Sequence, residues 1–254
     1  MNWLGGMGWC LGWCLDRLPE RLRYWVVWQL IRTVSCSPTM RRKLIAMPHL
    51  MIGARERAAE SILHRLRLQR PLLPWPAAEH LRALELKNGR LGGVLLGAHL
   101  STNRHVLRNL KAQGIDVAIV SLFDGASQSV PGVRQIMPSK QMYFAIRQQV
   151  RKGAWVLLTL DQFKPFPGAH KMLIAPELKR RFPQSLFLQT TAIPALIQMQ
   201  LPLLLMFPHL SQTGLEVEIS ELSRDPETAF CQYVDALNRV LRAVHELHAD
   251  RADA

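Results

Sequence analysis

The chain has 254 residues, 48% of them hydrophobic and 20% charged, so it can bury a core and is not a disordered protein. Its 32 Lys and Arg outnumber its 19 Asp and Glu, and the net charge of +13 favours an anionic partner, either nucleic acid or an anionic membrane surface. Five of the seven Trp lie within the first 28 residues, and no aromatic and basic pattern of RNA-binding sheets is present. Because Trp prefers the membrane–water interface, we expect a membrane surface and no nucleic acid.

The first segment, Met1–Leu15, carries no charged side chain. It is shorter than the roughly 20 residues that a membrane-spanning helix needs, and it lacks the early Lys or Arg and the cleavage site of a signal peptide. We expect an interfacial or re-entrant helix anchored by Trp3, Trp9 and Trp13. The alternative is that this segment and the apolar block Tyr24–Ile31 are helices packed on a soluble domain.

A basic, helical pattern continues from Pro38 to Leu86, with apolar residues at helical spacing over Ile52–Leu68. Prolines at positions 71, 74 and 76 then interrupt it. We therefore expect a helical membrane-associated region over residues 1–75 and a separate α/β domain over residues 76–254.

Beyond Leu91, the spacing of the hydrophobic residues alternates between that of strands and that of helices. The expected strands are Val94–Ala98, Ile115–Leu122, Ala154–Leu160, Pro202–Phe207 and Leu215–Ser220. The expected helices are Asn103–Gln113, Ser139–Lys152, Thr190–Gln200 and a long helix from Pro226, with loops at Asp124–Pro138 and Lys164–His170. Strands that alternate with helices predict an α/β fold, with a mostly parallel central sheet and helices on both faces.

The four cysteines do not form a disulfide framework or a zinc motif. Cys10 and Cys14 could share a helical face, but no second ligand pair follows them, and Cys36 and Cys231 are isolated. We expect reduced, buried cysteines and no metal.

His99 is the residue that most directly suggests chemistry. It follows the apolar run Val94–Ala98 and precedes a predicted helix, so it lies at the carboxyl end of a strand, where open α/β sheets bind ligands. A histidine at such a position can move protons near neutral pH. The alternative is that it is only a loop residue.

Four blocks in this order resemble the lipid A biosynthesis acyltransferases, the late lauroyl and myristoyl transferases of lipopolysaccharide assembly. They are Gly97–Asn103 (GAHLSTN), Gly153–Gln162 (GAWVLLTLDQ), Phe187–Leu196 (FLQTTAIPAL) and Leu201–Pro208 (LPLLLMFP). The resemblance covers most of the chain from about Gly89 to Pro208.

The resemblance implies an acyltransferase-like fold and a bacterial inner-membrane enzyme on the cytoplasmic face. Such an enzyme moves a fatty acyl group from acyl carrier protein, or acyl-CoA, to a membrane glycolipid or phospholipid acceptor, without a metal or other cofactor. In the family motif, a histidine takes the acceptor's proton and an acid five positions later orients the imidazole. His99 matches this histidine, but position 104 is Arg instead of Asp or Glu.

This departure leaves three interpretations. Asp161 or Asp124 could orient His99 instead, Arg104 could bind a phosphate or carboxylate of an altered substrate, or the chain could be a catalytically silent relative that binds membrane lipid or acyl carrier protein. Arg104 is also a candidate to stabilise the oxyanion of the transition state.

The candidate catalytic residues are therefore His99, Arg104 and Asp161. Candidate substrate-binding residues are polar or basic side chains that could contact an acyl donor or a phosphorylated glycolipid: Asn103, Gln162, Lys164, Lys171, Arg180 and Arg181. The motifs of α/β-hydrolases, P-loop proteins, dinucleotide-binding folds and zinc proteases are absent from the sequence. The resemblance to the lipid A acyltransferases thus implies a membrane-associated acyltransferase.

Overall fold

The structure is a computed structural model that describes residues 10–35, 76–89, 91–100, 103–121, 132–162, 170–172, 186–210 and 215–249. Its contacts divide the chain into two units, Met1–Trp75 and Pro76–Ala254. In the first unit, residues 10–15 are helical and α2 spans Glu20–Ser35. The expected helix over Ile52–Leu68 lies outside the described residues. Among the described helices, none combines the length and the apolar character needed to cross a membrane.

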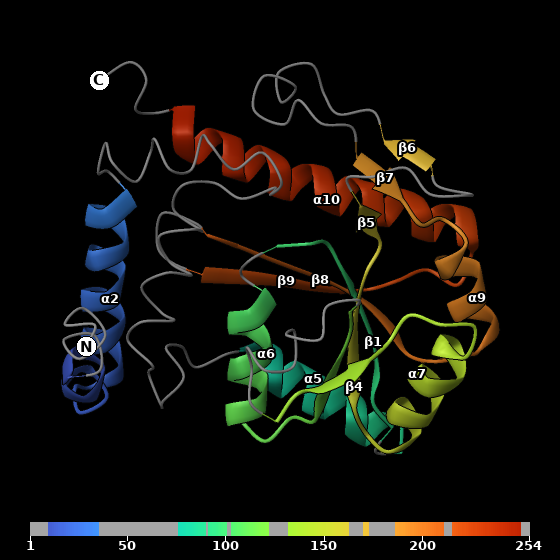
Figure 1. Ribbon diagram of the computed structural model, residues 1–254, viewed down its shortest axis with the longest axis horizontal. Coiled ribbons are helices and arrows are strands. Elements are labelled where there is room, and N and C mark those ends of the chain that lie inside the picture. The colour runs from blue at the N-terminus through green and yellow to red at the C-terminus, as the bar shows by residue number, and fades with distance from the viewer. Residues whose placement is uncertain are drawn as a thin grey trace. The chain divides into compact units, whose positions relative to one another are not determined.

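The second unit is built on a six-stranded sheet (Figure 1). Its strands are β1 (Gly93–Gly97), β2 (Val117–Val120), β3 (Arg134–Ile136), β4 (Trp155–Thr159), β8 (Leu203–Leu210) and β9 (Leu215–Glu221), in the order β3-β2-β4-β1-β8-β9. All neighbours are parallel except β8 and β9. The predicted mostly parallel α/β sheet is thereby confirmed.

Helices accompany this sheet on both sides. They are α5 (Pro76–Lys87), α6 (Asn103–Ala112), α7 (Met142–Arg151), α9 (Ala192–Gln198) and α10 (Pro226–Ala249). Figure 1 shows α6 on one side of β1 and β4 and α7 on the other. This arrangement follows from right-handed crossovers, because the chain moves across the sheet in one direction after β1 and returns in the other after β3.

The central strand β1 is buried along its whole length. At two positions of β1, close neighbours leave no room for a side chain, so glycine is required. A Cβ on Gly93 would lie 2.5 Å from the Trp155 ring, and one on Gly97 would lie 2.9 Å from the Met206 carbonyl oxygen. β1 can therefore lie between β4 and β8 only because these two positions carry no side chain.

Two features of the sheets differ from our predictions. The expected loop Asp124–Pro138 contains β3, a short edge strand whose pairing with β2 is not signalled by its sequence, RQI. A second sheet, in the order β5-β7-β6, is formed by β5 (Asp161–Gln162), β7 (Leu186–Leu188) and β6 (His170–Met172). Strands of two or three residues carry too few side chains to show a period, so only their long-range pairing reveals them.

The helix α10 begins as its sequence predicts. Asp225 accepts hydrogen bonds from the backbone N–H of Thr228 at 2.8 Å and from its hydroxyl at 2.7 Å, and Pro226 is the first helical residue. Its buried residues include Ala229, Tyr233 and Ala236.

The prediction of buried cysteines is wrong for the three that the structure describes. Cys10, Cys14 and Cys231 are free thiols, but all three are exposed. Cys231 lies two positions from Ala229 and from Tyr233, which are both buried on α10, so the helical period of 3.6 turns Cys231 toward solvent. Cys36 lies outside the described residues.

Candidate active site

The candidate site begins where β1 ends. Ala98 is completely buried, whereas the His99 side chain is 48% exposed. The imidazole therefore projects to the surface at the carboxyl end of a central parallel strand, although the next residue, Leu100, is buried again. Exposure of this degree leaves the ring accessible to a substrate.

The neighbouring strand supplies the carboxylate that contacts this ring. β1 pairs with β4 so that Gly97 lies opposite Thr159, and the chain continues from β4 directly into β5, which begins at Asp161. β5 is held in turn by antiparallel pairing of Asp161 with Leu188 in β7. The two strand ends thus arrive together, with His99 on one and Asp161 on the other.

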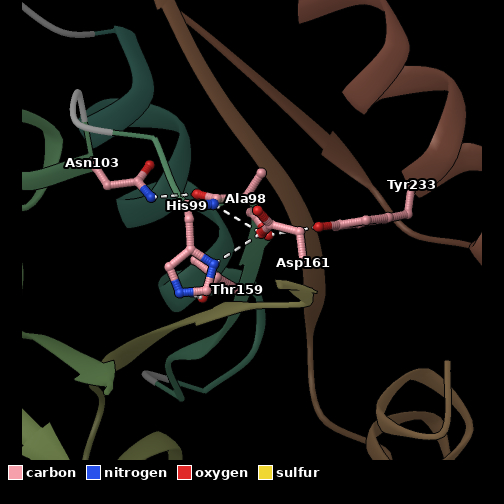
Figure 2. Close-up of polar contacts among 7 residues, drawn as sticks. Ala98, His99, Asn103, Thr159, Asp161 and Tyr233 are labelled. Atoms are coloured by element: carbon pink, nitrogen blue, oxygen red, sulfur yellow. Dashed lines mark hydrogen bonds and ion pairs between the residues drawn. The ribbon is translucent and has the colours of Figure 1, made fainter. Parts of the chain in front are cut away.

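Asp161 is completely buried and makes two contacts with His99 (Figure 2). Its Oδ1 accepts a hydrogen bond from the His99 backbone N–H at 2.8 Å and lies 3.2 Å from the ring Nδ1. Because Oδ1 acts as an acceptor for the backbone, we assign the ring proton to Nδ1, where it is donated to the same carboxylate. The lone pair of the neutral ring is then on Nε2.

The pKa of His99 reflects opposing effects. Burial lowers it, but the hydrogen bond to Asp161 and the negative charge of this carboxylate raise it by more, so the pKa lies above its ordinary value of 6.5. Asp161 therefore makes the imidazole a stronger base and fixes the orientation of its ring. These are the two properties that a general base requires.

The other ring nitrogen faces a hydroxyl group. Thr159 Oγ1 lies 3.2 Å from His99 Nε2. Figure 2 shows Thr159 and Asp161 both beside the His99 ring, which thus has a hydroxyl at one nitrogen and a carboxylate at the other.

Two buried side chains support the backbone next to the ring. Tyr233 of α10 donates its hydroxyl to the Gly97 carbonyl at 2.9 Å, and Asn103 donates its amide to the Ala98 carbonyl at 2.7 Å. Burial, reinforced by the charge of Asp161, raises the pKa of Tyr233 well above its usual value, so its hydroxyl stays protonated. Among the described residues, Asp161 Oδ2 and Asn103 Oδ1 are buried without a hydrogen-bond partner.

The structure brings only some of the candidate residues together. His99 and Asp161 are in contact, and Asn103 lies buried beside Ala98 with its amide nitrogen engaged there. Gln162 follows Asp161 in β5, and the exposed Lys171 lies in β6 of the same small sheet. Arg104 is the second residue of α6, but its side chain is outside what the structure describes. Lys164, Arg180, Arg181 and the alternative carboxylate Asp124 also lie outside the described residues.

Sequence reasoning missed Thr159 and Tyr233. Thr159 lies two positions before Asp161, so a strand period of two indicates that both side chains face the same way. The period alone does not show that these side chains lie next to His99, because that depends on the pairing of β4 with β1. Tyr233 lies 136 residues from Gly97, and no local pattern could connect them.

The fold and the site define an α/β protein with a histidine–carboxylate pair at the carboxyl end of its parallel sheet. In the described part of the chain, no group of three or more His, Cys, Asp and Glu is arranged to hold a metal ion. No protein-family model matches the chain, and no curated protein matches its sequence.

Proposed function

We propose that this chain is a membrane-associated acyltransferase. It transfers a fatty acyl group from an acyl thioester, carried by acyl carrier protein or CoA, to a hydroxyl or amine of a lipid A-like glycolipid or another membrane lipid. The four sequence blocks that resemble the late acyltransferases support the reaction and the acceptor class, and the Trp-rich, basic N-terminus supports action at the cytoplasmic face of an inner membrane.

The observation that carries the proposal is the contact between His99 and Asp161. An acyl acceptor hydroxyl is a poor nucleophile until a base removes its proton. His99 has the attributes of this base, because Nδ1 is held by a buried carboxylate, the pKa of the ring is raised, and half of the side chain is accessible. Asp161 thus takes the place of the acid that is missing at position 104.

The four resembling blocks also meet around this site. They contain the last residue of β1, all of β4 and β5, and parts of β7 and β8, and β1 lies between β4 and β8 in the sheet. Segments that lie far apart in the sequence therefore contribute to one neighbourhood. This convergence favours an enzyme over a protein in which the blocks serve separate structural purposes.

The test is acyl transfer by purified protein. Wild-type chain, His99→Ala and His80→Ala would be incubated with radiolabelled lauroyl-acyl carrier protein and bacterial inner-membrane lipid. We expect transfer to lipid by the wild type and a decrease of about 10²–10⁴-fold in His99→Ala, the contribution typical of a general base. His80 is an exposed histidine on α5, so His80→Ala is the matched control and should retain full activity.

Two results would contradict the proposal. Undiminished transfer by a folded His99→Ala protein would show that the imidazole is not the base. No transfer by the wild type, combined with retention of acyl carrier protein or lipid, would favour the silent binding protein.

A further inference from the structure

Three side chains at the site form a continuous chain of contacts. Thr159 Oγ1 is 3.2 Å from His99 Nε2, and His99 Nδ1 is 3.2 Å from Asp161 Oδ1. The order hydroxyl, imidazole, carboxylate is that of a catalytic triad, in which the base touches the nucleophile and is oriented by a third group. An enzyme that transferred its acyl group directly would need the histidine and the carboxylate but not the hydroxyl of the protein itself.

We propose that Thr159 is a covalent nucleophile that carries the acyl group as an ester between donor and acceptor. This inference rests on the proposed acyl transfer and deepens it, since it replaces one direct displacement by two steps through an acyl-threonine intermediate.

The backbone presents Thr159 for this role. It is the last residue of β4 and lies opposite Gly97, so its side chain emerges where the parallel strands end. Its neighbours Leu158 and Leu160 are almost completely buried, whereas Thr159 is partly exposed. A thioester that reaches the half-exposed ring of His99 therefore also reaches this hydroxyl.

In the first step, Thr159 Oγ1 attacks the carbonyl carbon of the acyl thioester while His99 Nε2 takes the hydroxyl proton. The Oγ1–carbon bond forms, the carbon–sulfur bond breaks, and the thiolate leaves as a thiol after it receives the proton from the imidazolium. Asp161 stabilises the imidazolium that exists between these proton transfers.

In the second step, the acceptor hydroxyl gives its proton to His99 Nε2 and its oxygen bonds to the acyl carbon. The carbon–Oγ1 bond breaks, and the threonine oxygen recovers a proton from the imidazolium. The enzyme returns to its starting state, and no oxidant, reductant or further reactant is consumed.

An ordinary structural explanation of Thr159 also exists, because β-branched residues are favoured in strands and a hydroxyl can simply satisfy a histidine nitrogen. Thr159→Val separates the two roles, because valine preserves the branched shape and removes only the hydroxyl. Thr159→Ser preserves a hydroxyl on a smaller side chain.

The experiment uses decanoyl-CoA as a soluble acyl thioester. The full chain would be incubated with this donor in the absence of lipid acceptor, quenched with acid and analysed by intact-protein and peptide mass spectrometry. We expect one decanoyl group on the peptide that contains position 159, both in the wild type and in Thr159→Ser. We expect no adduct in Thr159→Val, and a decrease in transfer of about 10²-fold or more when the nucleophile is lost. Thr191 is exposed and makes no side-chain hydrogen bond at the start of α9, so Thr191→Val is the matched control.

The outcomes distinguish this inference from the function on which it rests. If Thr159→Val transfers acyl groups at the wild-type rate while His99→Ala is inactive, the acyl-threonine is wrong and direct transfer stands. A two-step transfer gives parallel lines in double-reciprocal plots of the initial rate against donor concentration at several acceptor concentrations. Intersecting lines, without a trapped adduct, would also overturn the acyl-threonine intermediate. If the wild type acquires the acyl group on Thr159 but forms no lipid product, the nucleophile is supported and the proposed acceptor is wrong. If the wild type forms neither the adduct nor the lipid product, both the acyl-threonine and the proposed acyl transfer are wrong.

Discussion

At the scale of single residues, the chemistry of His99 depends on how two effects on its ring balance. Burial disfavours the imidazolium, whereas the Asp161 carboxylate favours it through a hydrogen bond and through its charge. The second effect is larger, so the pKa of His99 lies above 6.5. The neutral ring, which is the form that accepts a proton, therefore becomes the major form only at a pH above this raised pKa.

This balance predicts how Asp161→Asn changes the pH dependence of kcat/KM. The substitution removes the negative charge, so burial dominates, the pKa of His99 falls and the acid limb of the kcat/KM profile moves to lower pH. The maximal rate should fall as well, by on the order of 10²–10⁴-fold, because an amide no longer selects the tautomer with its proton on Nδ1. The pH–rate profile measures the maximal rate and the position of the acid limb, and an NMR titration of the histidine measures the pKa of His99 directly.

Asp235→Asn on the exposed surface of α10 is the matched control, because it removes the same charge away from the ring. An acid limb that moves equally in both variants would mean that His99 responds to net charge alone, and the assigned role of Asp161 would be wrong.

At the scale of elements, the site depends on how α10 and β1 are joined. Tyr233 of α10 donates a hydrogen bond to the Gly97 carbonyl, two residues before His99, and its ring packs against Phe207 of β8 with centroids 5.5 Å apart. The Leu160 backbone N–H, 3.3 Å from the same Gly97 oxygen, adds a contact from the segment that leads to Asp161. One carbonyl therefore links the helix to both strand ends of the site.

We expect Tyr233→Phe to destabilise the protein by about 1 kcal/mol, because it removes one buried hydrogen bond and leaves the Gly97 oxygen with its weaker partner. This cost corresponds to a decrease in Tm of roughly 2–4 °C for a domain of this size, measurable by thermal denaturation followed by circular dichroism. Tyr143→Phe on α7 removes the hydroxyl of a half-buried tyrosine and is the control. Equal Tm values for Tyr233→Phe and the wild type would show that this contact does not hold α10 to β1.

At the scale of the whole molecule, the net charge of +13 and the tryptophans of the first unit determine the expected partner surface. Trp13 and Trp25 are 50% and 58% exposed, and the Arg17 guanidinium lies 3.3 Å from the centroid of the Trp13 ring. Exposed indole rings, one of them beside a cation, match the interfacial region of an anionic bilayer, where both groups are favoured.

We expect the protein to co-float with vesicles that contain phosphatidylglycerol and to bind neutral phosphatidylcholine vesicles less. About 1 M salt should weaken binding, since the Debye length falls to roughly 3 Å. The double substitution Trp13→Ala/Trp25→Ala should reduce binding further, whereas Phe144→Ala, which removes an exposed aromatic residue of the second unit, should not. Binding that ignores salt, lipid charge and both tryptophans would contradict a membrane surface as the partner.

The local elements could be predicted because their signals are local. β1, β4, α6, α7 and α10 lie within a few residues of the predicted segments, since an apolar run, a helical period and a proline at a helix start act over a few neighbouring positions. For the same reason the sequence placed His99 at the end of a strand. It also indicated Asp161 at the end of another strand and made it a catalytic candidate, with Asp124 as the other carboxylate that could orient His99.

Which of these strand ends meet depends on long-range packing. The pairing of Gly97 with Thr159 brings Thr159 and Asp161 to opposite nitrogens of His99, and α10 adds Tyr233 from 136 residues away. Strand order and register are selected by side-chain packing between distant segments, and β1 can take its place only because Gly93 and Gly97 carry no side chain. Local sequence patterns are therefore enough to identify the candidate base, whereas its partners Thr159, Asp161 and Tyr233 are brought to it by packing between distant segments, which no local pattern encodes.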